Sequence, residues 1–214
     1  QYALRAFFDH PNDVKKTGLT PGLKGKRVII QGLGNVGYHA ALFLSNEDGC
    51  LITHVIERDG SVINPKGVNI KELREYIFKN GGVKDFKGFV SKGAEILEED
   101  ADILIPAAME LVINKGNAEK IKTPLIIEAA NGPVSSEADE ILSKKGIVII
   151  PDLYANAGGV TVSYFEWIKN LSRIRLGRLQ RRAQENQTIL MIKALEKMTG
   201  SKFPDEYKDL VMQG

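Results

Sequence analysis

The sequence predicts an α/β fold, with a doubly wound and mostly parallel sheet and helices on both of its faces. Short apolar runs alternate with segments of helical periodicity along most of the chain. The apolar runs are hydrophobic at consecutive positions, as strands buried on both faces are. A glycine-rich turn joins the first apolar run to a helical segment. A chain of 214 residues is long enough to bury the core of one such unit.

The expected elements follow one another in the order of a doubly wound sheet. Asn69 with Glu72 makes a cap-like start for helix 70–79, which ends at Gly81-Gly82. Ser136 and Asp139 form a second capping pair, for a helix that ends at 144–146. The expected strands are 27–31, 51–56, 101–105, 125–130 and 147–150. Further helices are expected at 1–8, 38–44, 160–171 and 188–198.

The first turn, residues 32–37, has the residue order of a dinucleotide-binding loop. Gly32 permits a sharp turn, Gly34 lets the backbone approach a diphosphate, and Gly37 allows the helix to pack closely on the strand. The helix that follows offers unpaired N–H groups at its start, from Gly34, Asn35 and Val36. The turn therefore predicts a Rossmann-type sheet that binds a nicotinamide dinucleotide.

The next strand ends at a carboxylate that bears on the choice of cofactor. Glu57 follows Gly37 by about 20 residues, where an acidic side chain can bind the ribose hydroxyls. A carboxylate repels a 2′-phosphate, so the sequence predicts NAD. Arg58 leaves NADP open, because it can pair with that phosphate if Glu57 points away.

A second glycine-rich turn follows the strand at 147–150. Its residues 156–167, Asn-Ala-Gly-Gly-Val-Thr-Val-Ser-Tyr-Phe-Glu-Trp, resemble the corresponding segment of the glutamate dehydrogenases, within the family that includes the leucine, phenylalanine and valine enzymes. The turn lies at the carboxyl end of a strand, where open α/β sheets bind ligands. Taken alone, it is also typical of a tight turn that Asn caps.

The resemblance implies an enzyme of reversible oxidative deamination, acting on L-glutamate, 2-oxoglutarate and ammonia. Ala107 and Ala108 then pass beside the adenosine half of the cofactor, and Asn131 reaches the nicotinamide ribose. Asn156 lies at the mouth of the catalytic cleft, near the nicotinamide and the substrate, and Ser163 binds the substrate's distal carboxylate. Close packing at the alanines and a helix-entry turn at Asn131 would account for the same residues.

The expected organisation is a single dinucleotide-binding domain over residues 1–214. It has an incoming helix at 1–10, a Rossmann core at 24–163 and C-terminal helices at 160–214. The chain opens within a helical pattern and stops on the apolar stretch 210–214, so we expect a segment of a longer protein. In the family a substrate domain precedes this one and carries the catalytic Lys and Asp, so the segment alone is predicted to be inactive. The family also implies a homohexamer.

Composition favours an ordinary globular protein and excludes several classes. The chain is 43% hydrophobic and 26% charged with a net charge of +2, and no run is long enough for a membrane span. The basic stretch 173–182 has interleaved apolar residues, which favours a solvated or subunit surface over nucleic-acid binding. The lone Cys50 is consistent with a cytoplasmic protein. The three histidines, His10, His39 and His54, lack the spacing of a metal site or a catalytic triad.

Two alternatives remain open at this point. One is a leucine- or phenylalanine-type dehydrogenase, which would prefer an apolar residue around position 163. The other is a module that senses the nicotinamide cofactor without catalysis, because such folds often bind a cofactor that they do not turn over.

Overall fold

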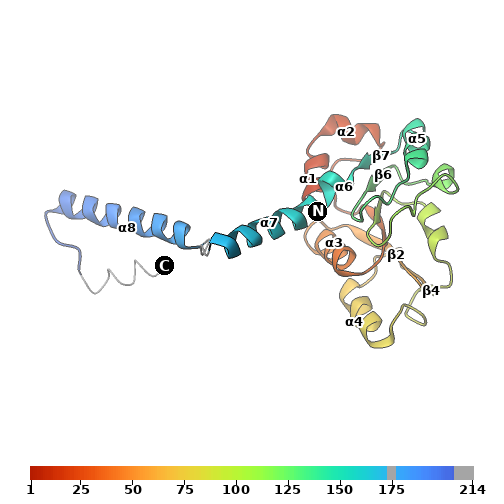
Figure 1. Cartoon of the computed structure of the whole chain (residues 1–214), viewed down its shortest axis with the longest axis horizontal. Coiled ribbons are helices and arrows are strands. Elements are labelled where there is room, and N and C mark those ends of the chain that lie inside the picture. The colour runs from red at the N-terminus through yellow and green to blue at the C-terminus, as the bar shows by residue number, and fades with distance from the viewer. Residues whose placement is uncertain (173–176, 205–214) are drawn as a thin grey trace. The chain divides into compact units, whose positions relative to one another are not determined.

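The computed structural model describes the backbone of residues 1–172 and 177–204, and the side chains of all of these except 172 and 177–186. It divides into two compact units, Gln1–Gly158 and Gly159–Gly214. The first unit contains a seven-stranded sheet (Figure 1). Its strands are β1 (Arg27–Gln31), β2 (Leu51–Glu57), β3 (Gly60–Ile63), β4 (Phe89–Val90), β5 (Ile103–Pro106), β6 (Leu125–Ile127) and β7 (Val148–Ile150).

The strand order is β4-β3-β2-β1-β5-β6-β7, and the five strands from β2 to β7 in this order pair in parallel. The predicted doubly wound sheet is thereby confirmed. The chain leaves β1 on one side to form β2 and later returns to its other side to form β5. The direction of winding therefore changes between β1 and β5, where open α/β sheets bind ligands beyond the carboxyl ends of the strands.

Helices cover both faces of the sheet, and the alternating residues of β1 show the division. Ile30 belongs to a buried apolar cluster with α1, α2, α3 and α4, whereas Ile29 belongs to a second cluster with η1, η2 and α5. The α-helices are α1 (Tyr2–Phe8), α2 (Pro11–Lys16), α3 (Asn35–Asn46), α4 (Ile70–Asn80), α5 (Ser136–Lys144), α6 (Asp152–Ala155), α7 (Ala157–Ser172) and α8 (Gly177–Thr199), and the 3₁₀ helices are η1 (Ala94–Glu98) and η2 (Ala118–Lys120).

The sequence missed the two strands at one edge of the sheet. β3 runs antiparallel to β2 in a hairpin that pairs Glu57 with Gly60, and β4 pairs antiparallel with β3. Gly60 has φ +145°, and a Cβ there would come within 2.5 Å of the Phe89 ring. The Asp59 carboxylate in the hairpin turn accepts the N–H of Val83 at 2.8 Å. These contacts join segments distant in sequence, so short-range patterns do not reveal them.

Two of the predicted helix ends are confirmed and one is wrong by a residue. The Asn69 side chain accepts the N–H of Glu72, and α4 ends at Gly81 in the left-handed conformation, as predicted. The N-cap of α5 is Ser135, whose hydroxyl accepts the N–H of Ala138 at 3.2 Å. The predicted cap, Ser136, is the first residue of the helix. Two adjacent serines give the same sequence signal, and the backbone geometry selects between them.

The second glycine-rich turn also differs from its prediction. Residues 152–155 form the short helix α6, and α7 already begins at Ala157, so Gly158 and Gly159 are helical rather than part of a turn. Asn156 stands between the two helices. The predicted helix 188–198 is the later part of α8, which begins at Gly177. Arg173 and Arg175 of the basic stretch and the final residues 210–214 lie outside the described residues.

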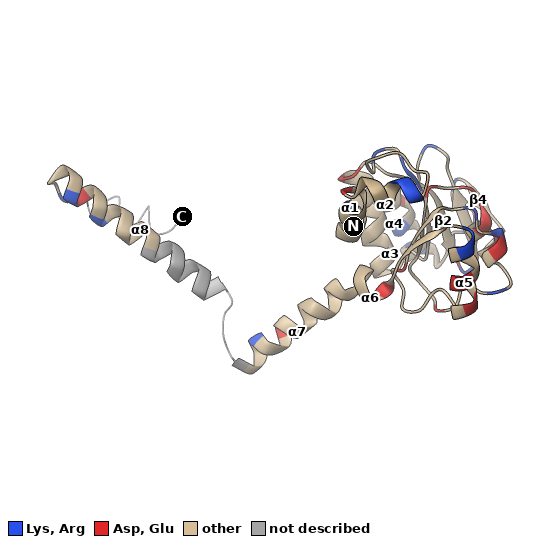
Figure 2. Ribbon diagram, turned by 90° about the horizontal axis from the view of Figure 1, so that it is seen from above, with Lys and Arg blue, Asp and Glu red and all other residues tan. Residues whose placement is uncertain are grey.

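The second unit contains most of α7, which carries few charges. Figure 2 shows this helix almost entirely in tan, because Glu166 and Lys169 are the only residues of its sequence that are Asp, Glu, Lys or Arg. Several of its large apolar side chains are exposed, among them Val160, Tyr164 and Trp167. None of the described helices combines the length and the apolar character needed to cross a bilayer.

The cap at α5 can be tested by a pair of substitutions. Ser135→Ala is expected to lower the free energy of unfolding by about 1 kcal/mol, because alanine cannot accept the N–H of Ala138. Ser136→Ala is the matched control, and its effect should stay within about 0.5 kcal/mol because this side chain is exposed. Urea unfolding followed by circular dichroism measures both. Equal losses in the two variants would contradict the assignment of the cap.

Candidate functional site

The turn between β1 and α3 has two glycines that the protein's own packing requires. Gly32 has φ +85°, and a Cβ there would lie 2.5 Å from Cβ of Ala108. A Cβ on Gly37 would overlap the carbonyl oxygen of Gly32. Any side chain at either position would therefore push the turn away from α3 or from the loop after β5. The sharp turn and the close helix packing predicted from the sequence are both present.

Gly34 is different, because the surrounding protein leaves it room for a side chain. Its φ of −66° and ψ of −164° are accessible to any residue. A Cβ built on Gly34 meets no atom of the described part of the chain within 4 Å. Neither backbone conformation nor packing accounts for glycine here. The space in front of Gly34 is what a ligand that approaches the backbone closely would need.

The start of α3 offers hydrogen-bond donors that the described residues do not use. Gly34 is the N-cap of α3 and provides no side-chain cap, in contrast to Asn69 at α4. Within the described part of the chain, the N–H groups of Gly34, Asn35 and Val36 make no hydrogen bond. These donors and the positive end of the helix dipole suit a phosphate.

Glu57, at the end of β2, holds the turn. Its Oε1 accepts the N–H of Leu33 at 2.5 Å, so the carboxylate faces the glycine-rich turn and does not point away. Its second oxygen makes no hydrogen bond to the residues that the structure describes. Arg58 follows with an exposed side chain. The arrangement places one negative and one positive side chain side by side at the end of β2.

A cavity of about 630 Å³ lies over the carboxyl ends of β1, β2 and β5. Six residues that the sequence predicted for cofactor binding line it: Gly32, Gly34, Glu57, Arg58, Ala107 and Ala108. Asn35, Val36 and Gly37 lie next to this cavity, in the first turn of α3. Chain segments that are up to 76 residues apart in sequence (Gly32 to Ala108) thus meet at one edge of the sheet.

The cavity is also lined by residues that the sequence did not predict for cofactor binding. Gln31 is a polar residue at the end of an apolar strand, which is a signal that could have been noticed. Its Oε1 is buried and has no hydrogen-bond partner among the described residues. A buried acceptor without a partner costs free energy unless a ligand or water donates to it. Gly93, Ala94 and Met109 also line the cavity, and nothing in their local sequence indicated this.

The two predicted asparagines meet in loops beyond β6 and β7. The Nδ2 of Asn156 donates to the Oδ1 of Asn131 at 2.8 Å. Asp152 supports the same pair of loops, since its Oδ2 accepts the N–H of Gly132 at 2.9 Å. The Oε2 of Glu128 in turn accepts the N–H of Asp152 at 2.9 Å. Neither asparagine lines the cavity at β1. The predicted site residues of the first unit therefore fall into two groups, one at the cavity and the other at the asparagine pair.

Glu128 is the buried member of this network. Burial raises the pKa of its carboxyl above the usual range, and the neighbouring Asp152 raises it further, against the hydrogen bond from the Asp152 backbone. Only 8% of the residue is exposed.

Ser163 lies on α7, in the second unit, and its side chain is exposed.

Comparisons with known proteins agree with this geometry. Residues 11–203 match the family described as Glutamate/Leucine/Phenylalanine/Valine dehydrogenase. The chain is 48% identical over 203 residues to a "Probable glutamate dehydrogenase" of Sinorhizobium fredii, covering 91% of this chain and 46% of that protein. It is 46% identical over 215 residues to "Glutamate dehydrogenase, mitochondrial" of Dictyostelium discoideum, covering 100% of this chain and 43% of that protein.

A solved structure shares the fold. The hetero-hexameric glutamate dehydrogenase from Thermus thermophilus, in its Leu bound form, superposes with a TM-score of 0.68 and 28% identity, over 80% of this chain and 40% of that one. The chain spans less than half the length of the two curated relatives. The matched range includes the glycine-rich turn, the cavity and both asparagine-bearing loops. The resemblance found in the sequence is confirmed, and the chain belongs to the glutamate, leucine, phenylalanine and valine dehydrogenase family.

Proposed function

We propose that this chain is the NAD(P)-binding part of an enzyme that catalyses the reversible oxidative deamination of L-glutamate to 2-oxoglutarate and ammonia. One observation carries the proposal. The start of α3 has no side-chain cap and presents N–H groups that no described residue accepts, beside a cavity at the point where the winding of the sheet reverses. The names of the curated relatives favour glutamate over leucine or phenylalanine as the substrate.

The residues of the cavity fit a dinucleotide from one end to the other. The N–H groups of Gly34, Asn35 and Val36 would hold the diphosphate, and the carboxylate of Glu57 the ribose of the adenosine half. The small side chains of Ala107 and Ala108 leave space beside them. The buried Oε1 of Gln31, which lacks a partner among the described residues, is suited to a hydroxyl or amide donor of the ligand.

The asparagine pair would serve the nicotinamide end. The hydrogen bond between Asn156 and Asn131 holds the loops after β6 and β7 together, and the contacts of Asp152 and Glu128 support them. Such rigid loops would fix the position of the ring and of the substrate's α-carbon. The bound nicotinamide supplies the chemistry of hydride transfer. We place Asn156 also beside the substrate, and Ser163 on its distal carboxylate.

The proton transfers of the reaction need a general acid and base, which the family supplies from a Lys and an Asp on another domain. We therefore assign no catalytic residue to this chain. We further propose that the full-length protein is a homohexamer; the related Thermus thermophilus enzyme is a hetero-hexamer. Cys50 is the only cysteine of the sequence and is buried, so the chain forms no internal disulfide, and we propose a reducing compartment such as the cytoplasm.

The first test concerns the approach of the diphosphate to the backbone. Gly34→Ala is expected to weaken NADH binding to the 214-residue chain at least about tenfold, because a methyl group would occupy the space that the phosphates need. The melting temperature should fall much less than in Gly37→Ala, since the new Cβ meets no atom of the described residues within 4 Å. Isothermal titration calorimetry measures the affinity.

Gly37→Ala is the matched control for this test. It is expected to lower the melting temperature, because its Cβ overlaps the Gly32 carbonyl. The chain itself should bind NADH without oxidising glutamate, since it lacks the acid–base pair. Absence of NADH binding at millimolar concentration, or unchanged affinity in Gly34→Ala, would argue against the cofactor site. Turnover by this chain would argue against catalysis by another domain.

The second test concerns the choice between NAD and NADP. Glu57 faces the turn, so we expect the chain to bind NADH at least about tenfold more tightly than NADPH. Glu57→Gln should narrow this ratio, because it removes the charge that repels a 2′-phosphate but keeps an acceptor for the Leu33 N–H. Glu75→Gln is the matched control, because it removes the same charge from an exposed position on α4 that does not line the cavity, and it should leave the ratio unchanged. Equal or tighter binding of NADPH by the unmodified chain would refute the preference.

The third test concerns the substrate, in the full-length enzyme. Ser163→Ala should weaken the binding of glutamate by about 1.5–3 kcal/mol, because a hydrogen-bond donor to its charged distal carboxylate is lost. Norvaline lacks the distal carboxylate and should be affected much less. Ser143→Ala, at an exposed position on α5, is the control substitution. Steady-state kinetics with both substrates measures the difference, and equal losses would show that Ser163 is a packing residue.

A further inference from the structure

The peptide groups of the glycine-rich turn are held from two sides by side chains of opposite charge. Glu57 accepts the N–H of Leu33 at 2.5 Å. Arg74, on α4, donates from Nη1 to the carbonyl oxygen of Leu33, and its Nη2 lies 3.4 Å from the Oδ1 of Asn35. The two side chains come from elements on either side of the turn. They fix the orientation of the backbone immediately before Gly34.

The contact with Arg74 also determines which donors of α3 remain free. If the helix extended one residue further back, the carbonyl of Leu33 would accept the N–H of Gly37. Arg74 takes this carbonyl instead, and the first backbone bond of the helix runs from Tyr38 N–H to Gly34 at 2.9 Å. The donors of the first turn are thus left for another acceptor.

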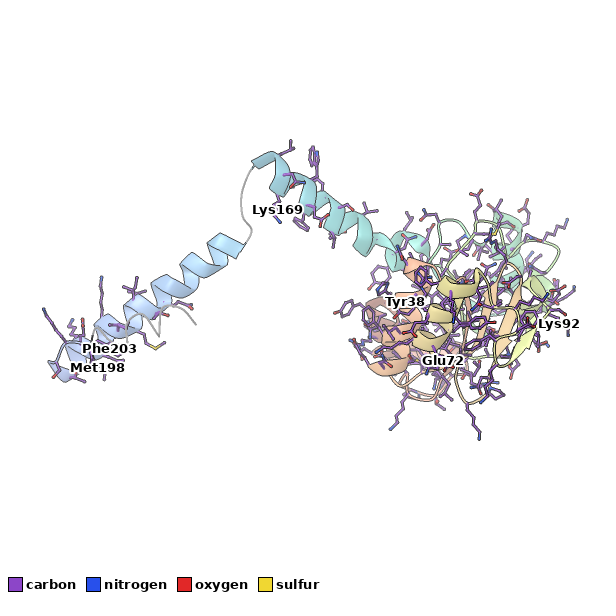
Figure 3. All side chains as sticks on the ribbon, turned by 90° about the horizontal axis from the view of Figure 1, so that it is seen from below. Tyr38, Glu72, Lys92, Lys169, Met198 and Phe203 are labelled. Carbon is purple, nitrogen blue, oxygen red and sulfur yellow. The ribbon has the colours of Figure 1, made fainter. Side chains whose placement is uncertain are left out.

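The charge of Arg74 lies in an unusual place. A cation beside the N-terminus of a helix faces the positive end of its dipole, which is unfavourable. No carboxylate of the described residues lies within ion-pair distance of Arg74. Its guanidinium instead lies over the rings of Phe78 at 4.4 Å and of Tyr38 at 5.4 Å, the latter labelled in Figure 3. Its Nε is buried without a partner among those residues.

We propose that Arg74 is the residue that positions the glycine-rich turn for a diphosphate and supplies a positive charge to it. This inference rests on the proposed function and adds a residue to that site. An anion at the start of α3 would relieve the repulsion between the guanidinium and the helix dipole. Both properties of Arg74 matter: its charge, and the planar fork that reaches Leu33 and Asn35 together.

Calorimetric titration of the 214-residue chain with ADP and with adenosine separates this role from general stabilisation. Arg74→Gln is expected to weaken the binding of ADP at least about tenfold. The affinity for adenosine should stay within about twofold of the wild-type value. Arg74→Lys should give an intermediate ADP affinity, because it restores the charge but not the fork. Lys71→Gln removes the same charge from an exposed position on α4 and should leave both affinities unchanged.

Four outcomes would overturn the proposal. For Arg74→Gln, these are an unchanged affinity for ADP and equal losses of affinity for ADP and adenosine. For Arg74→Lys, they are an ADP affinity as low as that of Arg74→Gln and an ADP affinity equal to that of the wild type. If Arg74→Gln does not fold, Arg74→Lys decides by the last criterion. A wild-type chain that binds neither NADH nor ADP would overturn the proposed function together with this inference. Wild-type binding with an unaffected Arg74 variant would overturn the inference alone.

Discussion

Parallel pairing of β1 with both β2 and β5 is the constraint on which the rest of the site depends. Strands that run in the same direction end at the same edge of the sheet, so the residues that follow each strand are brought together there. The glycine-rich turn follows β1, Glu57 ends β2, and Ala107 follows β5. The reversal of winding at β1 also keeps crossing helices away from this edge, which leaves room for the cavity.

The glycine-rich turn shows how one short segment meets two kinds of demand. Gly32 and Gly37 are glycines because the protein itself would collide with a side chain, whereas a side chain at Gly34 would meet none of the residues that the structure describes. Next to them, the ionic side chains of Glu57 and Arg74 bind the peptide groups of Leu33, which precede the helix. A capping side chain would occupy the donors of the first helical turn, and the grip of Glu57 and Arg74 on Leu33 leaves them available.

The loops after β6 and β7 are joined by a series of polar contacts, one of which is part-buried. Glu128 binds the backbone of Asp152, Asp152 binds the backbone of Gly132, and Asn156 binds Asn131. Each contact joins residues 20 to 25 positions apart. The contact of Glu128 is part-buried, whereas those of Asp152 and Asn156 are exposed. Together the three contacts join the loop after β6 to the loop after β7.

The sequence by itself determined the features that arise from contacts between near neighbours. Apolar runs revealed the five parallel strands, the steric freedom of glycine revealed the turn before α3, and the cap at Asn69 followed from residue types a few positions apart. The family was also evident, because its motifs are continuous in sequence. Gly32, Gly34, Glu57 and Ala108 could be placed at one site because each follows or ends a strand.

Tertiary structure alone decided the remainder. The edge strands β3 and β4 depend on contacts of Gly60 with Phe89 and of Asp59 with Val83. Arg74 and Leu33, which form a hydrogen bond, are 41 residues apart in sequence. Either serine could cap α5 by its residue type, and the extended backbone of Ser135 makes it the N-cap. Such contacts require distant segments to be folded against one another first. A pattern read over a few residues carries no information about which partner a side chain will meet.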